Sequence, residues 1–310
     1  MQLRTGFCLL MASLVAGGCS REATPPDAAT PKPATPKPAT TPGKTLPTDD
    51  LGRKVTLRDV PQRIVCIGPG ATETVYALGL GNRIVGRDSG SDYPAAAQQV
   101  PIVADYKGPF FEGLVAQRPD LIVAQGETWG RARIEEWQKK SGAPVVALSA
   151  TTVEGVARGI VKLGAWLGAP VEATKLAADF KTSTAKPDAR WTAFIETQRA
   201  PLWSAGRDTL LGDAARAAGL NNIANIRGYK NYSIETLLTQ QPMFYVVSGK
   251  PAQRASIIAD LKRQPGLTNL KCVQAGRVLV VDPDLLLRPS PRLSDGIRAL
   301  RAEAEKYSRI

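Results

Sequence analysis

The chain has 310 residues, with 40 Lys and Arg against 28 Asp and Glu, a formal net charge of +12, and no histidine. The lack of histidine excludes Ser-His-Asp and Cys-His catalysis and removes the usual ligand of catalytic and transport zinc sites. Arginine-rich runs, zinc-finger spacings and RNA-binding aromatic motifs are also missing from the sequence, so nucleic acid is not an expected partner and a solvated basic surface explains the charge.

Residues 1–18 are typical of a secretion signal. Arg4 precedes an apolar run at residues 7–15, and small residues at 16–18 lead into Cys19. The run is too short to span a membrane as a mature helix. A cysteine in this place is typical of a bacterial lipoprotein signal, so we expect Cys19 to become the lipid-modified N-terminus. The alternative is ordinary cleavage to a soluble exported protein, and either outcome predicts an extracytoplasmic location, in the periplasm or at the outer cell surface.

Residues 19–48 are predicted to be a tether between this anchor and a folded body. They contain "ATPKPATPKPATTPGK", whose repeated prolines favour extended polyproline conformations and which offers almost nothing to bury. About 260 residues remain, which is enough for two lobes of ordinary domain size.

The stretch "CIGPGATETVYALGLG" at residues 66–81 has the layout of a nucleotide-binding turn. Glu73, however, replaces the third glycine of the G-x-G-x-x-G fingerprint, and no P-loop lysine follows. We therefore expect a tight turn at residues 68–70 followed by a helix, with Glu73 complementing the helix dipole. The apolar face of that helix consists of Ala71, Val75 and Leu78.

Residues 49–150 are predicted to form a doubly wound α/β lobe, because apolar strand-like runs alternate with helical stretches. The expected strands are residues 63–67, 83–86, 120–124 and 144–148, and the helices between them include residues 111–117 and 130–141. Residues 151–198 are predicted to be a helical region that joins the lobes. Its helix runs from Val153 to about Thr184 and is broken near residues 168–170, where Pro170 suits the first turn of a second helix.

Residues 199–310 are predicted to form a second α/β lobe. Its expected strands are residues 201–205, 243–247 and 277–281, and its expected helices are residues 211–219, 233–240 and 291–307. Cys66 and Cys272 are the cysteines of the two lobes, and two cysteines do not make a disulfide framework. Cys66 lies in an apolar strand, which favours a buried free thiol.

An internal repeat relates the two lobes. "FEGLVAQRPDLIVAQG" (residues 111–126) and "IETLLTQQPMFYVVSG" (residues 234–249) align without gaps and share Glu, Leu, Gln, Pro, Val and Gly at matching positions. Both segments are interpreted as a helix, a proline turn and a buried strand. Two lobes of similar topology therefore each present a helix that starts with a glutamate, Glu112 in one and Glu235 in the other.

Two similar lobes predict a cleft between them, where small-molecule sites are most common. Loops at the carboxyl ends of the strands would line it. These loops are rich in aromatic residues, and a flat, partly apolar ligand would explain them. The alternative is that these aromatic residues pack locally. We expect about half of the six aromatic residues in these loops to face the cleft. The six are Tyr93, Tyr106, Trp129, Trp203, Tyr229 and Tyr232.

Three segments together resemble the substrate-binding proteins of bacterial importers for cobalamin, ferric siderophores and haem. They are "RIVCIGPGATETVYALGLGNRIVGRDSGSDYP", "FEGLVAQRPDLIVA" and "GRVLVVDPDLLLRPSPRLSDGI", and the resemblance spans residues 49–310. It implies two α/β lobes bridged by a single long helix, with a ligand cleft between them and little hinge closure. It also implies a monomer that docks on a permease dimer with separate ATPase subunits, using Glu112 and Glu235 as carboxylates that meet permease arginines.

The resemblance leaves the ligand open. In cobalamin-binding members aromatic residues surround the corrin, and Tyr93, Tyr106, Trp203 and Tyr229 fall at such positions. Gln125 stands where a tryptophan is expected, and nearby Trp129 would substitute for it. A haem carrier could instead use a tyrosine as axial ligand.

Two arginines add to the expected ligand contacts. Arg288 and Arg292 could meet carboxylate, phosphate or hydroxamate oxygens, or could hold the loop before the last helix. We rank a corrinoid first, a ferric siderophore second and haem third. The chelate is cargo, and no intrinsic cofactor or protein metal site is expected.

Two other classes of function stay open. Asp282 and Asp284, or Asp105 near Glu112, could be paired carboxylates of a glycosidase. Nothing in their spacing demands this, and Asp-Pro turn chemistry explains "VDPD". A tethered scaffold with a side-chain-filled cleft is the other alternative, but the binding-protein interpretation, without enzymatic activity, is favoured.

Overall fold

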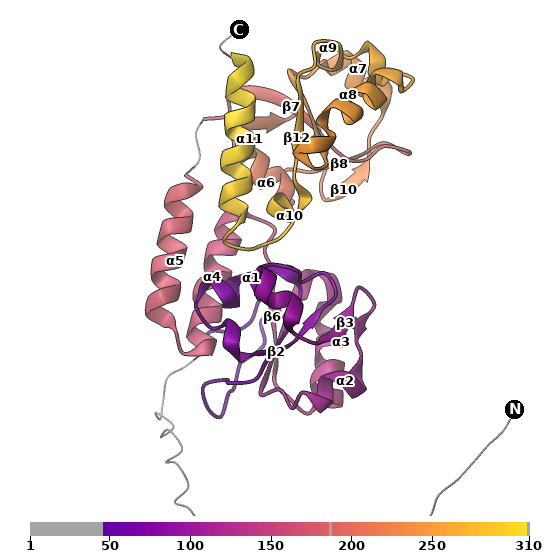
Figure 1. Ribbon diagram of the computed structural model, residues 1–310. Coiled ribbons are helices and arrows are strands. Elements are labelled where there is room, and N and C mark those ends of the chain that lie inside the picture. The colour runs from indigo at the N-terminus through magenta and orange to yellow at the C-terminus, as the bar shows by residue number, and fades with distance from the viewer. Residues whose placement is uncertain (1–45, 186–187, 309–310) are drawn as a thin grey trace, which may run out of the picture. The chain divides into compact units, whose positions relative to one another are not determined.

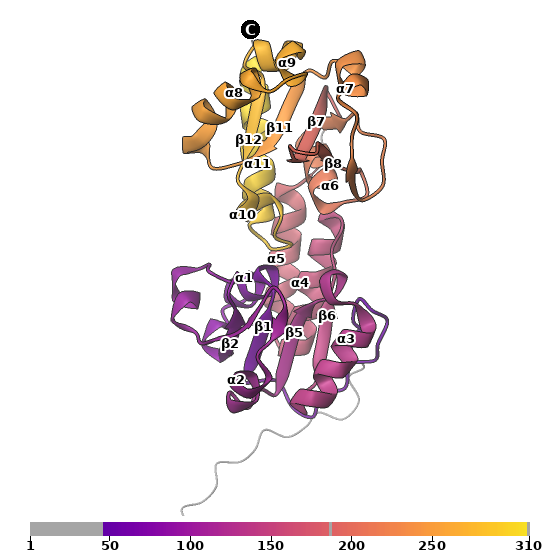
Figure 2. The same ribbon diagram turned by 90° about the vertical axis from the view of Figure 1, so that its right-hand side faces the viewer.

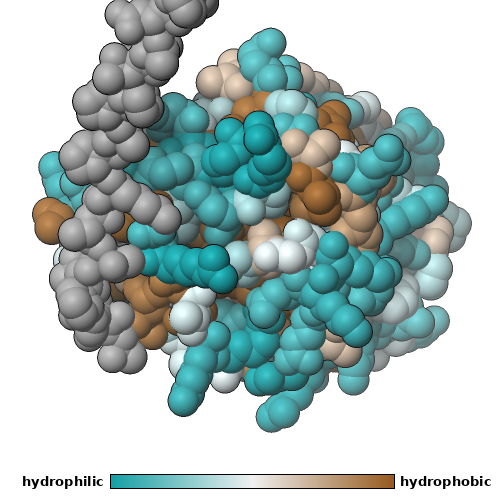
Figure 3. Space-filling view, turned by 90° about the horizontal axis from the view of Figure 1, so that it is seen from below, coloured by the Kyte–Doolittle hydropathy of each residue, from teal (hydrophilic) through white to brown (hydrophobic). Residues whose placement is uncertain are grey.

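The computed structural model describes residues 46–185 and 188–308. Cys19, the signal and nearly all of the predicted tether lie outside these residues. The described part contains two sheets flanked by helices, which confirms the predicted α/β class (Figures 1 and 2). None of the described helices has both the length and the apolarity needed to span a bilayer. Seen from below, most side chains are hydrophilic and hydrophobic ones form small separate patches (Figure 3).

The N-terminal lobe is built on a sheet in the order β4-β3-β2-β1-β5-β6, parallel except for β4. The central strands are apolar and buried except for Gln125 at the end of one of them, as expected for parallel strands covered on both faces. The strands are β1 Ile64–Ile67, β2 Ile84–Asp88, β3 Ile102–Asp105, β4 Gly108–Pro109, β5 Leu121–Gln125 and β6 Val145–Leu148. The helices are α1 Pro69–Ala77, α2 Phe111–Ala116 and α3 Gly126–Ser141.

The C-terminal lobe is built on a sheet in the order β10-β8-β7-β11-β12, with β9 also paired to β7. β7 is parallel to β9 and β11, and β11 is parallel to β12, whereas β8 is antiparallel to both β7 and β10. The strands are β7 Trp191–Gln198, β8 Trp203–Ala205, β9 Leu220–Asn222, β10 Tyr229–Asn231, β11 Phe244–Ser248 and β12 Val278–Val281. The helices are α6 Leu210–Ala217, α7 Ile234–Gln240, α8 Arg254–Arg263, α9 Lys271–Gln274, α10 Pro283–Leu286 and α11 Leu293–Ser308.

One predicted boundary is wrong. The sequence predicts residues 151–198 to be helical, but residues 191–198 form β7 inside the second sheet. Their side chains are mostly buried, and Phe194 and Ile195 are fully so. The C-terminal sheet therefore begins before residue 199.

Two packed helices connect the lobes, α4 Val153–Leu167 and α5 Pro170–Ser183. The break falls where the sequence predicts it, because Gly168 ends α4 with φ 75° and Pro170 begins α5. The helices approach closely at Gly164, where a Cβ atom would lie 2.1 Å from that of Ala173. The two helices therefore form a close pair.

Contacts at the ends of the pair show how it runs. The N–H of Val153 donates to Asp213 of α6, in the C-terminal lobe, and the carbonyl of Leu167 accepts from Arg83 in the N-terminal lobe. After α5, the carbonyl of Ala185 accepts from a side chain of α11. The α5 helix therefore carries the chain from one lobe to the other, beside both (Figure 1).

The outer edge of the first sheet is closed by residues 49–53. β6 is an edge strand, and its outward groups are met by the segment at residues 49–53. Arg53 donates to the carbonyl of Val145 over 2.6 Å, Asp49 accepts from the N–H of Ala147 over 3.2 Å, and the N–H of Asp50 donates to the Ala147 carbonyl over 3.0 Å. An unpaired edge strand would otherwise offer a template for association.

The repeat is visible in the backbone. The units α2–β5 and α7–β11 occupy corresponding places, each with its strand second from the edge of a sheet. Arg118 and Gln241, with φ of 47° and 43°, are the non-glycine residues of positive φ in the described chain, and they match in the repeat alignment. Each precedes a proline, whose ring disfavours the right-handed helical conformation in the residue before it.

Candidate functional site

The carboxyl edges of the two sheets face each other. In the N-terminal lobe, parallel pairing puts the ends of β1, β2, β3, β5 and β6 at one edge. In the C-terminal lobe, β12 leads into α10 and then into residues 287–292, which reach across to α1 of the first lobe. Pro289 of this segment lies so close to Gly70 that a Cβ atom there would be 2.6 Å from the Pro289 carbonyl oxygen. Loops at these two edges are the candidate binding site.

A polar cluster joins the two edges around Glu73, whose side chain is only 2% exposed. Its carboxylate accepts hydrogen bonds from Arg288 over 3.1 Å, from Arg292 over 3.2 Å and from the Ser290 hydroxyl over 2.6 Å. The predicted dipole role of Glu73 is therefore wrong, because it is the fifth residue of α1 rather than part of its first turn. We call Glu73, Arg288, Ser290 and Arg292, together with Asp92 and Asp284, the interlobe cluster.

Arg288 is engaged by three carboxylates. Besides Glu73, it donates to Asp92 and to Asp284 over 2.7 Å each. Burial acts to lower the pKa of Arg288, but its hydrogen bonds to Asp92 and Glu73 outweigh this and raise it. The Arg288 hydrogen bond in turn lowers the pKa of Asp92. The geometry favours the alternative weighed from the sequence, in which Arg288 holds its loop, and a ligand contact by Arg288 stays a prediction.

The three predicted aromatic residues of the N-terminal lobe differ in surroundings. Tyr93 is half exposed, and the guanidinium carbon of Arg292 lies 3.6 Å from its ring centre. Tyr106, in the β3–β4 turn, is 81% exposed. Trp129 instead packs on Trp137, with ring centres 5.0 Å apart. Tyr93 and Tyr106 are therefore exposed, whereas Trp129 is partly exposed and also packs locally, and ligand contact by each of them stays a prediction.

In the C-terminal lobe, strand register brings two of the predicted aromatic residues together. Trp203 is opposite Asn231, and Tyr229 is opposite Ala205, so Trp203 and Tyr229 are diagonal neighbours on one face. Tyr229 is half exposed. The indole N–H of Trp203 is buried and has no acceptor within residues 46–185 and 188–308.

The side chain of Tyr232 packs against neighbouring residues of its own lobe. Its hydroxyl donates to Gln240 over 2.6 Å, and its ring lies 5.1 Å from that of Phe194. Burial raises the pKa of Tyr232, although the hydrogen bond to Gln240 acts to lower it. Five of the six aromatic residues, Tyr93, Tyr106, Trp129, Trp203 and Tyr229, therefore remain candidates for ligand contact.

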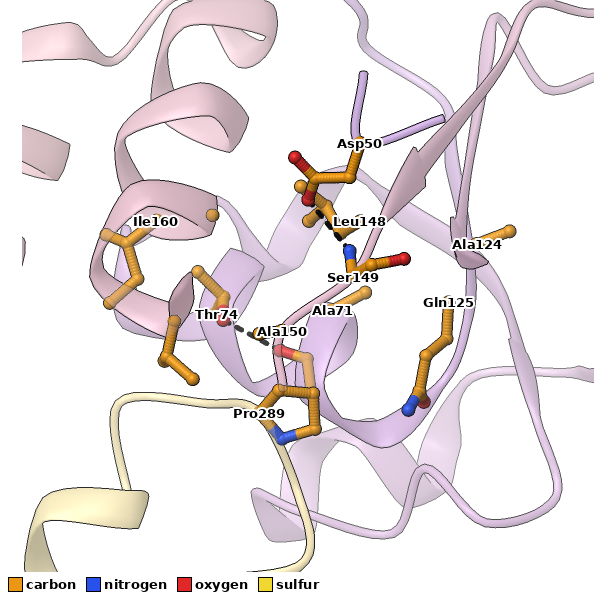
Figure 4. A pocket seen from close by; sticks show the side chains of 13 residues that line it. Asp50, Ala71, Thr74, Ala124, Gln125, Leu148, Ser149, Ala150, Ile160 and Pro289 are labelled. Carbon is orange, nitrogen blue, oxygen red and sulfur yellow. Dashed lines mark hydrogen bonds between the residues drawn. The ribbon is translucent and has the colours of Figure 1, made fainter. Parts of the chain in front are cut away.

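A small, partly open cavity lies where α1, β5, β6 and α4 meet the Pro289 segment (Figure 4). Its volume is about 30 Å³, which suits about two water molecules and is far too small for a metal chelate. The Asp50 carboxylate at its wall accepts from the Ser149 N–H and pairs with Lys162. No group of three potential metal ligands occurs among the described residues.

The carboxylates of the enzyme alternative have structural partners. Lys250 pairs with both Asp282 and Asp284, and Asp282 caps the N-terminus of α10, as Asp-Pro turn chemistry predicts. Cys66 and Cys272 are both buried free thiols, as expected for Cys66.

The two predicted docking glutamates are exposed and lie in the first turns of α2 and α7. Both helices lie on the side of the molecule opposite α5 (Figure 1). The Ser233 hydroxyl donates to Glu235 and lowers the pKa of that carboxyl.

Sequence reasoning missed Glu73, Asp92 and Ser290 as contacts between the lobes. A charged residue inside an apolar helix was the available signal for Glu73. Its partners lie 215 to 219 residues away in the chain, so no local pattern identifies them.

Comparison with known proteins agrees with this geometry. Residues 64–285 match the periplasmic binding protein family. The vitamin B12-binding protein of Pectobacterium carotovorum is 29% identical over 244 residues, which cover 76% of this chain and 85% of that protein. The ABC transporter substrate-binding lipoprotein YvrC of Bacillus subtilis is 26% identical over 316 residues, covering 97% and 96%.

The chain is also similar to a solved structure of a binding protein. The periplasmic heme binding protein from Pseudomonas aeruginosa is 32% identical, with a TM-score of 0.66, and the match covers 78% of this chain and 92% of that one. These relatives are named as binding proteins and transporter components, not as enzymes. The chain belongs to the periplasmic binding protein family.

Proposed function

We propose that the chain is the extracytoplasmic substrate-binding component of an ABC importer, and that it captures a large metal chelate. A corrinoid is the first-ranked candidate for this ligand. The observation that carries the proposal is the set of aromatic side chains on the two facing edges. Tyr93 and Tyr106 stand on one edge, and Trp203 and Tyr229 on the other. The family match and the named relatives support the transport role.

The chemistry of capture follows from these groups. The aromatic rings would stack on and bury the apolar faces of a macrocycle. The side chain of Trp203 is partly exposed and would add to this apolar contact. The interlobe cluster holds the two edges in place before binding, and such preorganisation lowers the entropic cost of association.

Delivery would use Glu112 and Glu235 to dock the loaded monomer on a permease dimer, whose separate ATPase drives import. Exposed ion pairs contribute only about 0–1 kcal/mol each, so they would mainly set orientation and encounter rate. A lipid on Cys19, which lies outside the described residues, would keep the protein at the membrane.

Haem is a second candidate, and one contact favours it. Tyrosine is a known axial ligand of haem iron. Arg292 lies over the ring of Tyr93, and a guanidinium there would stabilise negative charge on a phenolate bonded to iron. A ferric siderophore would use the same aromatic and cationic groups and is distinguished by the test below.

The test is a titration of the chain from Leu46 onward with cyanocobalamin, haemin and ferric siderophores, followed by tryptophan fluorescence and calorimetry. We expect sub-micromolar binding of cyanocobalamin, weakened about tenfold in Trp203→Ala because its stacking area is lost, and unchanged in the control Val171→Ala on α5. Haemin binding that loses its tyrosinate absorption in Tyr93→Phe would replace the corrinoid with haem. Failure to bind any of these chelates would refute the proposal.

A further inference from the structure

The N-terminal lobe has a second surface at the edge opposite the candidate binding site. Because its central strands are parallel, the segments that lead into β1, β2, β5 and β6 gather at one edge, away from the carboxyl ends. The turn between α4 and α5 lies at the same edge, because Arg83 donates to the carbonyls of both Pro61 and Leu167. Figure 3 views the molecule from this side. We call this surface the amino face and define it as residues 54–63, 79–83, 116–120, 139–144 and 168–172.

The amino face has an excess of positive charge. Its acidic residues are Asp59, Asp120 and Glu172, whereas its basic residues are the partly exposed Arg83 and the exposed Lys54, Arg58, Arg63, Arg118, Lys139 and Lys140. Asp120 accepts hydrogen bonds from the backbone N–H groups of Gln62 and Arg63 over 2.7 and 2.9 Å. Lys140 pairs with Glu136, one turn earlier on α3. The remaining excess of cations favours an anionic partner.

A hollow of about 650 Å³ opens on the amino face. Residues 54–59 form one wall, and the turns that precede β5 and β6 form the other. Lys54 and Arg58 line the hollow together with Asp59 and Asp120. The two cations suit a phosphate group, and the two carboxylates suit the hydroxyl or ammonium groups that phospholipid headgroups carry beside their phosphate.

Two exposed apolar side chains lie at the α4–α5 turn. Val171, the second residue of α5, is 76% exposed, and Val60 is 49% exposed. Val60 is next to the turn, since a Cβ atom on Gly168 would lie 2.8 Å from its side chain. Apolar side chains beside cations suit a bilayer surface, where the apolar groups enter the headgroup region and the cations meet phosphates.

The chain enters the described structure beside the amino face. The carbonyl of Pro47 accepts from Trp166 over 3.0 Å, and Trp166 is the residue before the last one of α4. A lipid on Cys19 would therefore attach the protein through a segment that joins the lobe at this end. A tethered surface meets its partner at a high effective concentration, so a contact that is weak by itself is sufficient.

We infer that the amino face is a membrane-facing surface that binds the anionic phospholipid headgroups of the bilayer carrying the protein. This inference rests on the proposed extracytoplasmic role and adds an orientation to it. The five residues of β5 rise about 17 Å from the amino face to the ligand edge, so the edge with Tyr93 would stand about that far above the headgroups. A second copy of the chain is a poor partner, because two amino faces would repel each other.

The size of the effect follows from the number of cations. Each Lys or Arg close to an anionic surface strengthens binding about fivefold. Lys54, Arg58 and Lys139 are all exposed, and together they would account for about a hundredfold in affinity.

The experiment uses residues 20–310, which keep the whole described fold but lack the signal and Cys19, so that no lipid contributes. Binding to sedimented vesicles is measured at low salt, with phosphatidylglycerol and phosphatidylcholine in equal parts and with phosphatidylcholine alone. The test variant replaces Lys54, Arg58 and Lys139 with Gln. The matched control removes the same charge from the C-terminal lobe, where Arg190, Lys262 and Lys271 are exposed and are also replaced with Gln.

We expect the wild type to bind the phosphatidylglycerol vesicles and not those of phosphatidylcholine alone. Binding should weaken at physiological ionic strength, where the screening length is about 8 Å. The test variant should bind at least about tenfold more weakly, whereas the control variant should bind like the wild type. Equal weakening in both variants would show that net charge alone attracts the protein, and would overturn the assignment to the amino face.

Absence of wild-type binding to phosphatidylglycerol vesicles would also overturn the inference. The chelate titration separates this result from the proposed function, because the aromatic residues proposed to hold the chelate lie at the opposite edge of the sheet. The test variant should therefore titrate with the chelate as the wild type does, which also shows that it is folded. Loss of chelate binding in the test variant would mean that the two edges are not independent, and would count against the inference.

Discussion

Replacing Glu73 with alanine tests whether the interlobe cluster holds the two lobes together. The carboxylate is 2% exposed and accepts from three donors within 3.2 Å. Removing one partner of a buried ion pair typically costs about 3–5 kcal/mol. Arg288 keeps Asp92 and Asp284 as partners, and Arg292 is partly exposed, so neither cation is stranded. We therefore expect a loss near the lower end, about 3 kcal/mol in the free energy of unfolding.

Urea denaturation at pH 7 measures this loss. Arg288→Met should cost less than Glu73→Ala, because Glu73 then keeps Arg292 and Ser290. The exposed pair of Asp295 and Arg298 on α11 gives the control, and Asp295→Ala should cost less than about 1 kcal/mol. A loss below about 1 kcal/mol for Glu73→Ala would show that the cluster does not stabilise the fold.

The change in the free energy of unfolding at acid pH offers a second measurement on the interlobe cluster. The Arg288 hydrogen bond lowers the pKa of Asp92 in the folded protein, and the Lys250 hydrogen bond does the same for Asp284. A carboxyl with a lowered folded-state pKa stabilises the protein above its unfolded pKa, about 3.9, and this contribution disappears as the pH falls through the folded pKa. Stability should therefore fall below about pH 4, with a shallower slope in Arg288→Met. Both carboxylates are partly exposed, which limits the size of the effect, and identical slopes would contradict it.

Three further predictions concern the core and the sheet edge. Burial raises the pKa of Cys66 to about 12 and that of Cys272 to about 11, so neither thiol should react with iodoacetamide at pH 8 until urea unfolds the chain; labelling of the native protein, read by mass spectrometry, would disprove this. Asp49→Ala removes the acceptor for the N–H of Ala147 at the β6 edge. We expect the free energy of unfolding to fall by about 2–3 kcal/mol and light scattering to increase on storage. If neither quantity changes, Asp49 does not protect this edge. Gly164→Val would force α4 away from Ala173 and should cost about 1–3 kcal/mol in urea denaturation, whereas an unchanged midpoint would mean that the helices separate freely.

The parts of the fold that the sequence predicts are those with an unbroken local signal. β1, β5, β6 and β11 are short apolar runs between turn residues, and their predicted positions agree with the structure to within a residue or two. The sequence pattern does not predict β7 as a strand, because Glu196 interrupts its apolar residues. In the structure this carboxylate is buried and satisfied by Arg199 and the hydroxyl of Tyr245, partners that a reader of the local sequence cannot assign.

The candidate site divides in the same way. Loop position alone placed Tyr93 and Tyr106 at the carboxyl edge of their sheet, because the topology of a parallel sheet fixes where such loops lie. It could not separate them from Trp129, whose packing depends on Trp137 eight residues later along α3. Nor could it show that Arg288 meets three carboxylates from different parts of the chain. These outcomes depend on tertiary packing, which no local pattern encodes.

The closed edge of β6 has a mechanical consequence. The chain enters the described structure at Leu46, and its first hydrogen bonds are made by Pro47, whose carbonyl accepts from Trp166 of α4, and by Asp49 and Asp50 at β6. A pull on the preceding chain would therefore load the base of the N-terminal lobe and its helical bridge first. The facing edges that carry Tyr93 and Trp203 lie outside this line of force. Such a pull would therefore break the hydrogen bonds between residues 49–50 and β6 before it disturbed the proposed ligand-binding site.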